Sequence, residues 1–155
     1  KNLVLKAFGR EPFSRHGFIS EKTIDAFWDK ARAEYQIKAS SGDEQARSLS
    51  GGNQQKVILA RELSEHPRVV VANQPTRGLD IGASEYVRQK LLDARNEGCA
   101  VLLVSADLEE ILQLSDRIAV IYDGRLMGVL PRGASVDEIG SLMMGKQKEA
   151  HEHGK

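Results

Sequence analysis

An α/β fold with a parallel sheet is the architecture that this 155-residue sequence predicts. Short apolar runs at residues 69–72, 100–104 and 117–122 have the length of buried strands. Segments with helical periodicity, at about 83–97 and 107–114, separate these runs. Strands that alternate with helices are typical of a parallel sheet covered by helices. The N-terminal part of the chain differs, because its apolar residues recur at helical spacing, so we expect a mainly helical part there.

The N-terminal part contains one strongly patterned helix, which Ser20 is expected to cap. Its apolar residues share one helix face and are Ile24, Phe27, Trp28, Ala31 and Tyr35. This spacing indicates core packing for Trp28 rather than a platform for a ligand. Loops are expected on both sides, at residues 10–17 and 40–44.

A second helix opens with the sequence Leu-Ser-Gly-Gly-Asn-Gln-Gln-Lys at residues 49–56 and stops before Pro67. Ser50 is a suitable N-cap, and Gly51 and Gly52 leave the first backbone N–H groups uncovered. Such a helix directs unpaired donors and the positive end of its dipole outward, which suits a phosphate group. Taken alone, the Leu-Ser-Gly-Gly letters favour an ordinary capped helix with a glycine-rich entry over a phosphate site.

The next segment, residues 69–80, reads Val-Val-Val-Ala-Asn-Gln-Pro-Thr-Arg-Gly-Leu-Asp. The two segments together resemble the nucleotide-binding cassette of ABC transporters, in which a Leu-Ser-Gly-Gly signature leads a helix and a strand ending Asp-Glu-Pro-Thr follows. The resemblance implies that Asp80 belongs to the D-loop and that residues 101–110 match the strand and turn of the switch histidine. Residues 115–124 are similar to the strand and hairpin that come next.

The resemblance reaches to about Gly145 and therefore covers nearly the whole chain. It implies a partial P-loop NTPase core of the RecA type, a parallel sheet with flanking helices, together with the helical subdomain of ABC cassettes. The implied domains are a helical subdomain with the signature helix at 1–65, the C-terminal part of the ATPase core at 66–145, and a disordered tail at 146–155.

Three positions depart from the family pattern at the residues that carry catalysis. Asn73 stands where the family has the Walker B aspartate, Gln74 where it has the catalytic glutamate, and Ala106 where it has the switch histidine. An amide lacks the negative charge that a hard dication or a general base requires. No catalytic or metal-binding residue is therefore expected to be intact in this half-site.

The resemblance places nucleotide binding at the signature and the D-loop. The implied binding residues are Ser50, Gly51, Gly52, Asn53, Gln54 and Asp80. ATP and Mg²⁺ are the implied cofactors of the full-length protein, with weak or no binding by this fragment, which is expected to be inactive alone.

The phosphate-cradling P-loop has only a near match in the chain, at residues 140–147. The match has Gln147 in place of the hydroxyl residue, and no apolar strand leads into it. Ser135 and Glu138 have the spacing of a capping box, which predicts that Gly140 lies within a short helix and that Gly145 ends it. We therefore expect the chain to be the C-terminal part of a cassette.

Composition narrows the possible partners. Lysine plus arginine equals aspartate plus glutamate, at 22 each, so no global basic charge favours nucleic acid. The single Cys99 cannot form an internal disulfide and is expected to be a small apolar residue at the start of a strand. No apolar run approaches the ~20 residues that span a bilayer. A link to the membrane would therefore come through a partner.

Asn53, at a signature position where many cassettes carry glutamine, resembles importers for simple sugars and nucleosides. In these, one polypeptide carries two cassettes, and the C-terminal one often lacks catalytic residues. The implied partners are the N-terminal cassette of the same polypeptide, a transmembrane permease and, indirectly, an extracytoplasmic solute-binding protein. The implied location is the cytoplasmic face of the membrane.

Three alternatives stay open on the sequence. A non-transport ABC ATPase would share the signature, but it would usually keep the carboxylates. A regulatory or structural module would use the same fold without binding nucleotide. An unrelated parallel α/β domain would share only the strand and helix pattern.

Overall fold

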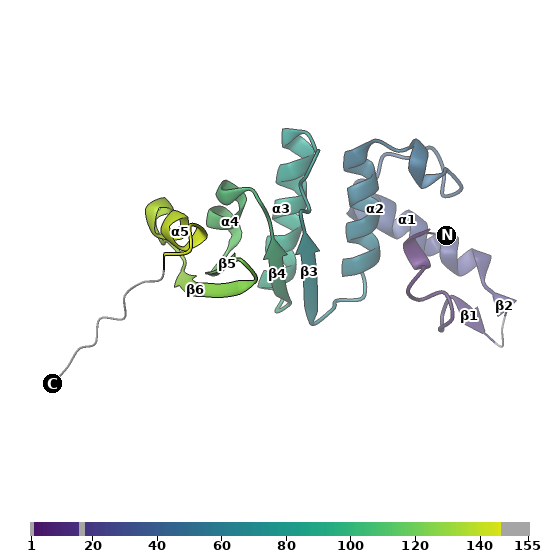
Figure 1. The fold of residues 1–155 in the computed structure, drawn as a ribbon. Helices are drawn as coiled ribbons and strands as arrows, with labels where there is room; N and C mark the ends of the chain where they lie inside the picture. The colour runs from purple at the N-terminus through teal and green to yellow at the C-terminus, as the bar shows by residue number, and fades with distance from the viewer. Residues whose placement is uncertain (1, 16–17, 147–155) are drawn as a thin grey trace. The chain divides into compact units, whose positions relative to one another are not determined.

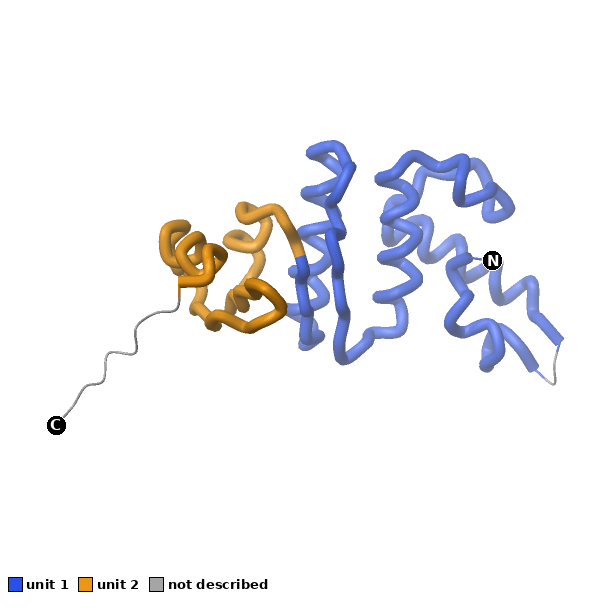
Figure 2. The backbone as a smooth tube through the Cα atoms, in the orientation of Figure 1, with its two compact units in different colours: residues 1–104 blue, residues 105–155 orange. Residues whose placement is uncertain are grey.

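The computed structural model describes residues 2–15 and 18–146 (Figure 1). The chain divides into two compact units, residues 1–104 and residues 105–155 (Figure 2). The predicted tail lies, from residue 147 on, outside the described residues. The elements of the first unit are η1 (Asn2–Val4), β1 (Ser14–Arg15), β2 (Phe18–Ile19), α1 (Glu21–Glu34), η2 (Ala46–Ser48), α2 (Gly51–Leu63), β3 (Val69–Asn73), α3 (Ile81–Asn96) and β4 (Ala100–Val104).

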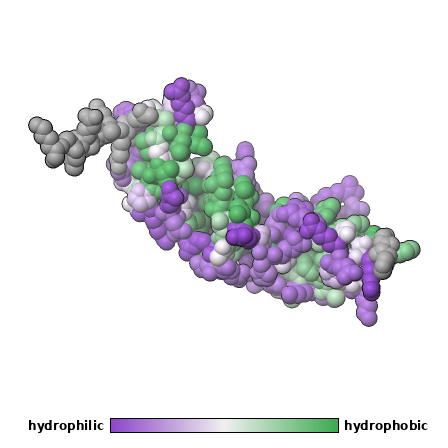
Figure 3. Space-filling view, turned by 90° about the horizontal axis from the view of Figure 1, so that it is seen from below, coloured by the Kyte–Doolittle hydropathy of each residue, from purple (hydrophilic) through white to green (hydrophobic). Residues whose placement is uncertain are grey.

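Strands β3 and β4 form a parallel pair whose register runs from Val69 opposite Ala100 to Asn73 opposite Val104. Their side chains alternate, as expected for strands with two different faces. One face contributes to the core of the unit, and the other exposes Val69, Val71, Leu102 and Val104. Apolar surface is visible over these strands in Figure 3. The two strands confirm the predicted runs at 69–72 and 100–104.

Helix α1 begins where the sequence predicts, because the Ser20 hydroxyl accepts a hydrogen bond from the Thr23 N–H at 3.4 Å. The predicted apolar stripe faces the core, where Ala31 is 2% exposed and Trp28 is partly buried. The expected loop at residues 10–17 contains strand β1, which pairs antiparallel with β2. A strand of two residues is too short for alternation to be visible in the sequence.

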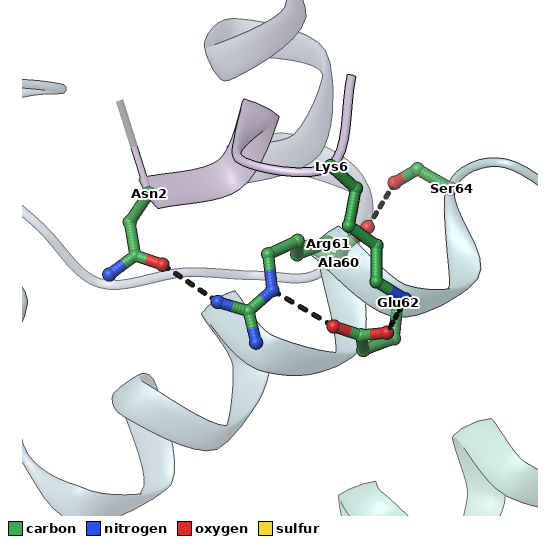
Figure 4. Close-up of polar contacts among 6 residues, drawn as sticks. All are labelled: Asn2, Lys6, Ala60, Arg61, Glu62 and Ser64. Carbon is green, nitrogen blue, oxygen red and sulfur yellow. Dashed lines mark hydrogen bonds and ion pairs between the residues drawn. The ribbon is translucent and has the colours of Figure 1, made fainter. Parts of the chain in front are cut away.

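The C-terminal half of α2 is tied to the segment that holds η1 (Figure 4). Arg61 donates to the Asn2 side-chain oxygen at 3.0 Å and pairs with Glu62 at 2.9 Å, while Lys6 contacts the same Glu62. Ion pairs that stay partly open to solvent add little stability. The main contribution is the burial of Leu3 in the same core as the α2 side chains.

The second unit contains α4 (Leu108–Leu114), β5 (Arg117–Tyr122), β6 (Arg125–Pro131) and α5 (Val136–Met143). Asp123 and Gly124 both have positive φ, 46° and 71°, which gives the tight turn predicted between β5 and β6. The core of this unit consists of Ile118, Val120, Leu130, Ile139 and Leu142.

The hairpin predicted after the run at 117–122 is confirmed, because β5 pairs antiparallel with β6. The same run was also expected to join a parallel sheet, which within the described residues consists of β3 and β4. The physical reason for the hairpin is local: the Asp123–Gly124 turn brings β6 directly beside β5, with little loop to close.

The division into subdomains at residue 65 stays a prediction, and residue 65 lies within the first compact unit. Within the described ranges, no helix is both long enough and apolar enough to cross a bilayer.

Candidate functional site

The N-terminus of α2 is exposed and capped by a serine. Ser50 is extended, with φ −59° and ψ 156°, and its hydroxyl oxygen accepts a hydrogen bond from the Asn53 N–H at 3.4 Å. Ser50 and Gly51 are both exposed to solvent. The amides of the first helical turn have no acceptor within the helix, because no turn precedes them. The arrangement directs a hydroxyl, amide donors and the positive end of the helix dipole toward the solvent at the N-terminus of α2.

The two glycines of this turn differ in what surrounds them. A Cβ built on Gly52 would lie 2.9 Å from the Cβ of Ala83 in α3, whereas one on Gly51 would lie 3.6 Å from the Leu79 side chain. Gly52 is therefore required for the close approach of α2 to α3. Gly51 tolerates a side chain in this structure, so any requirement for glycine there has to come from something that approaches from outside.

Two polar side chains of α2 point back into the protein. The Asn53 carboxamide oxygen accepts a hydrogen bond from the Lys38 N–H at 2.8 Å, and its NH₂ group donates to the Ser50 hydroxyl at 3.0 Å. Gln54 donates to the Leu49 carbonyl at 2.8 Å. Both amides therefore hold the turn that carries Ser50.

Asp80 has an identifiable structural role at the start of α3. Its carboxylate accepts a hydrogen bond from the Ala83 N–H at 2.8 Å, which caps the helix. This cap explains why α3 begins at Ile81, two residues before the predicted start. Since Ala83 is also the residue that contacts Gly52, Asp80 places the surface on which α2 packs.

The carboxyl end of β3 carries Asn73 and Gln74. Asn73 is exposed and lies opposite Val104 in the sheet register. Gln74 has a positive φ of 50°, and its N–H donates to the Val104 carbonyl at 2.7 Å. A positive φ costs energy for a residue with a Cβ and is concentrated at functional sites. The backbone at Gln74 thus has a left-handed conformation, although neither Asn73 nor Gln74 carries a charged side chain.

Ala106 lies in the second unit, in the turn before α4. On either side of it, Ser105 accepts a hydrogen bond from the Asp107 N–H at 3.0 Å, and Asp107 caps α4 through the Glu109 N–H at 3.0 Å. The turn is therefore ordered by its neighbours, while the methyl group of Ala106 can neither donate nor accept a proton.

The near match to a P-loop is excluded by its secondary structure. Gly140 lies inside α5, as predicted, and Ser135 and Glu138 form the capping box that begins this helix. Gly145 has φ 80° and follows the end of the helix. A P-loop needs a strand before it and a helix after it. Residues 140–146 have the reverse arrangement, a helix and then its terminus, and Gln147 lies outside the described residues.

Relatives with recorded functions match almost the whole chain. It is 43% identical over 146 residues to the nucleoside import ATP-binding protein NupA of Lactococcus lactis subsp. cremoris, covering 94% of this chain and 29% of that protein. It is 45% identical over 155 residues to the guanosine import ATP-binding protein NupO of Bacillus subtilis, covering 97% and 30%. It is 36% identical over 149 residues to the ribose import ATP-binding protein RbsA of Lacticaseibacillus paracasei, covering 96% and 29%. The chain thus spans less than a third of the length of these relatives.

Solved structures agree with these relatives. The chain superposes on a dimeric ATP-binding cassette, MJ0796 bound to ADP and Pi, with a TM-score of 0.64 and 25% identity over 79% of this chain and 53% of that one. No protein-family model matches. The chain has the fold of the ATP-binding cassettes of ABC transporters and is similar in sequence to the ATP-binding proteins of sugar and nucleoside importers. A second structure, an ATP-binding subunit of an ABC transporter, has a TM-score of 0.69 at 20% identity over 92% of this chain and 60% of that one, and supports the fold.

By this similarity, α2 is predicted to be the signature helix and α3 to follow the D-loop. The N-terminus of the signature helix fits a phosphate group, because it combines an exposed hydroxyl with unpaired amides. The Walker B end of β3 does not fit Mg²⁺, because Asn73 and Gln74 supply no negative charge. Among residues 2–15 and 18–146, no group of three or more His, Cys, Asp or Glu side chains gathers as a metal site.

The structure places the predicted signature turn beside the first turn of α3, which Asp80 caps, because a Cβ on Gly52 would lie 2.9 Å from that of Ala83. The assignment of nucleotide contacts to Ser50, Gly51, Gly52, Asn53, Gln54 and Asp80 stays a prediction. Ala106 belongs to the other compact unit, and its role relative to Gln74 stays a prediction as well.

The sequence analysis missed a cluster of lysines and tyrosines behind the signature helix. The Tyr86 hydroxyl donates to the Tyr35 carbonyl at 2.9 Å, and the Lys56 amine lies 4.5 Å from the centre of the Tyr86 ring. Burial raises the pKa of Tyr86 to about 12, so its hydroxyl stays a donor at neutral pH. The cluster joins the end of α1 to α2 and α3. No spacing signal links Lys56 to Tyr86, since they meet only when the two helices pack.

Proposed function

We propose that this chain is the C-terminal part of the second, degenerate cassette of an ABC import ATPase, and that its signature completes the ATPase site of the partner cassette. In the proposed complex, two cassettes pair head to tail, and each nucleotide lies between the P-loop of one cassette and the signature of the other. The N-terminal cassette of the same polypeptide would be the partner.

The proposal rests on the contrast between the N-terminus of α2 and the carboxyl end of β3, which lie in the same compact unit. The signature end of α2 keeps an exposed hydroxyl and open amides, while the Walker B end of β3 holds Asn73 and Gln74. Ser50 and the first amides of α2 would stabilise charge on the transferring phosphoryl group at the partner's site. The half-site at the end of β3, with Asn73 and Gln74, would hold nucleotide without hydrolysing it.

The proposed solute class is a simple sugar or a nucleoside. Support comes from the relatives, whose names record import of nucleosides, guanosine and ribose. The ATPase subunit would lie at the cytoplasmic face of the membrane and act through a permease, with an extracytoplasmic binding protein delivering the solute. ATP binding would close the cassette pair, and hydrolysis at the single working site would open it.

The permease would contact the helical part of the chain, roughly residues 13–48. A hollow of about 310 Å³ lies beside Trp28, with the loop at residues 41–44 on its rim. Cysteines placed at residues 10–17 and 40–44 should cross-link to the permease in the assembled transporter. Cross-linking from a face distant from both loops, with none from either loop, would contradict this contact.

The decisive experiment compares two single variants in the full-length transporter ATPase. Gly51→Leu places a side chain at the exposed signature turn, and we expect the ATPase rate to fall roughly 10²–10³-fold, as for loss of a preorganised donor. Gln74→Ala removes a residue that cannot act as a base, so the rate should change by only a few-fold.

The matched control is Gly140→Leu, because a Cβ at Gly140 meets nothing within 4 Å. It makes the same chemical change in a helix of the other unit and should keep the wild-type rate. If Gln74→Ala is as damaging as Gly51→Leu, the proposal of one working site fails.

A further inference from the structure

We propose that Asn53 is a positioning residue of the signature site, which sets the Ser50 hydroxyl as a hydrogen-bond donor toward a phosphoryl oxygen. The inference rests on the proposed function of the signature. It differs from a direct contact between Asn53 and nucleotide, because it assigns both polar groups of the Asn53 side chain to partners within the protein.

The orientation of the Asn53 carboxamide follows from its partner on the core side. A backbone N–H can only donate, so the Lys38 N–H at 2.8 Å requires the carboxamide oxygen to face it. The NH₂ group must then face the Ser50 hydroxyl, at 3.0 Å. Lys38 is itself held in place, because its neighbours Ile37 and Ala39 are buried, at 3% and 8% exposure.

The direction of the Ser50 proton follows from the same contacts. The hydroxyl oxygen accepts two hydrogen bonds, one from the Asn53 NH₂ group at 3.0 Å and one from the Asn53 N–H at 3.4 Å. A serine hydroxyl has two acceptor lone pairs and one donor proton. With both lone pairs occupied, the proton points away from Asn53. Since Ser50 is exposed, this proton is available to an acceptor that arrives from outside, and phosphoryl oxygens are acceptors.

The contacts also connect the signature to the rest of the helical part. Residues 36–38, which follow α1, are joined to α2 by two hydrogen bonds. One is from the Lys38 N–H to Asn53, and the other is from the Lys56 amine to the Gln36 carbonyl at 3.2 Å. The Ser50 donor is thus oriented by a chain of contacts that begins in the core. Preorganised donors of this kind lower the barrier because they need no reorganisation during the reaction.

The test uses Asn53→Asp in the full-length ATPase assembled with its permease. Aspartate keeps the shape and still accepts from the Lys38 N–H, but its second oxygen accepts where the NH₂ group donated. The Ser50 hydroxyl proton should turn toward this carboxylate oxygen, so that it is no longer available to donate to the phosphate. We expect kcat to fall at least tenfold and toward the 10²-fold typical of one lost donor, with the KM for ATP changed less than threefold.

The matched control is Gln55→Glu, which makes the same amide-to-acid change two residues further along the helix, at a residue without an assigned contact to nucleotide. It should keep kcat within about threefold if charge alone is harmless. Equal losses in Asn53→Asp and Gln55→Glu would attribute the effect to charge and overturn the inference. Thermal unfolding of each variant checks that the subunit is folded.

A double-variant cycle separates positioning from direct contact. Ser50→Ala removes the proton that Asn53 is proposed to direct, so adding Asn53→Asp to Ser50→Ala should change kcat little further. A full additional loss in the Ser50→Ala background would show that Asn53 acts independently of Ser50 and overturn the inference. If Ser50→Ala itself keeps the wild-type rate, the signature does not act in hydrolysis and the proposed function fails too. If Ser50→Ala is slow while Asn53→Asp is normal, only the positioning role fails.

Discussion

The N-terminus of α2 and the carboxyl end of β3 lie in the same compact unit, and under the proposed function they belong to two different nucleotide sites. The first keeps its donors: an exposed Ser50 hydroxyl, oriented by Asn53, and the amides of a capped turn. The second keeps its backbone, a turn with Gln74 at positive φ, but carries no charge at Asn73 or Gln74. The comparison teaches that backbone shape and chemical function are separable within one cassette.

The two regions also differ in what constrains them. Gly52 is held by packing, because any side chain there meets Ala83. Gln74 is held by a backbone hydrogen bond to the Val104 carbonyl, which does not depend on whether its side chain is charged. A side chain at Gly52 is therefore expected to disturb the packing of α2 against α3, whereas the side-chain chemistry of Gln74 is expected to matter less to the fold than its backbone conformation. The predictions below test this difference, from the largest expected effect to the smallest.

The largest effect concerns the isolated chain. Because no P-loop is present in this sequence and the β3 end has no acidic pair, residues 1–155 alone should show no ATPase activity and at best weak ATP affinity. Phosphate release from the purified fragment should equal that of a mock-purified control. Turnover above that control would show that the β3 end is catalytic after all.

The second effect separates the two signature glycines by stability. Gly52→Ala should lower the free energy of unfolding by about 1–3 kcal/mol, as in overpacked cores, because its Cβ would lie 2.9 Å from that of Ala83. Gly51→Ala is the matched control and should be neutral or slightly stabilising, since alanine favours the helix. Thermal unfolding of the purified ATPase subunit measures both. Equal losses would contradict the packing difference.

The third effect is at Gln74. Glycine adopts positive φ without strain, so Gln74→Gly should raise the free energy of unfolding by up to about 1 kcal/mol, with the ATPase rate of the full-length protein within a few-fold of wild type. Gln74→Val, which suits this conformation poorly, should lower stability. A destabilising Gln74→Gly would mean that the glutamine side chain makes a contact essential to the fold.

The smallest effect is a gain. Restoring Asn73→Asp, Gln74→Glu and Ala106→His together should add hydrolysis at the silent site, in a full-length protein whose second P-loop is intact. With two working sites in place of one, the steady-state rate should rise by no more than about twofold, which corresponds to about 0.4 kcal/mol. An unchanged rate would show that the silent site lacks more than these three groups.

Much of the local structure was predictable from residue types alone. The caps at Ser20, Ser50 and Ser135 begin helices as expected, because a side-chain oxygen beside free amides is a strong local signal. The Asp123–Gly124 turn followed for the same reason. The resemblance to ABC cassettes and the uncharged residues Asn73, Gln74 and Ala106 at its predicted catalytic positions were also evident, since a motif is defined by residue identity and spacing.

Tertiary structure decided the features that depend on which elements meet. The contact of Gly52 with Ala83 and the Tyr86 cluster both join segments whose approach no spacing encodes. The sequence by itself determined which polar residues stand at the predicted signature. It also determined that the predicted catalytic positions carry no charged side chain. Only the fold decided that Asn53 turns inward to Lys38 and orients Ser50, because a hydrogen bond between residues 15 apart exists only when packing brings the two segments together.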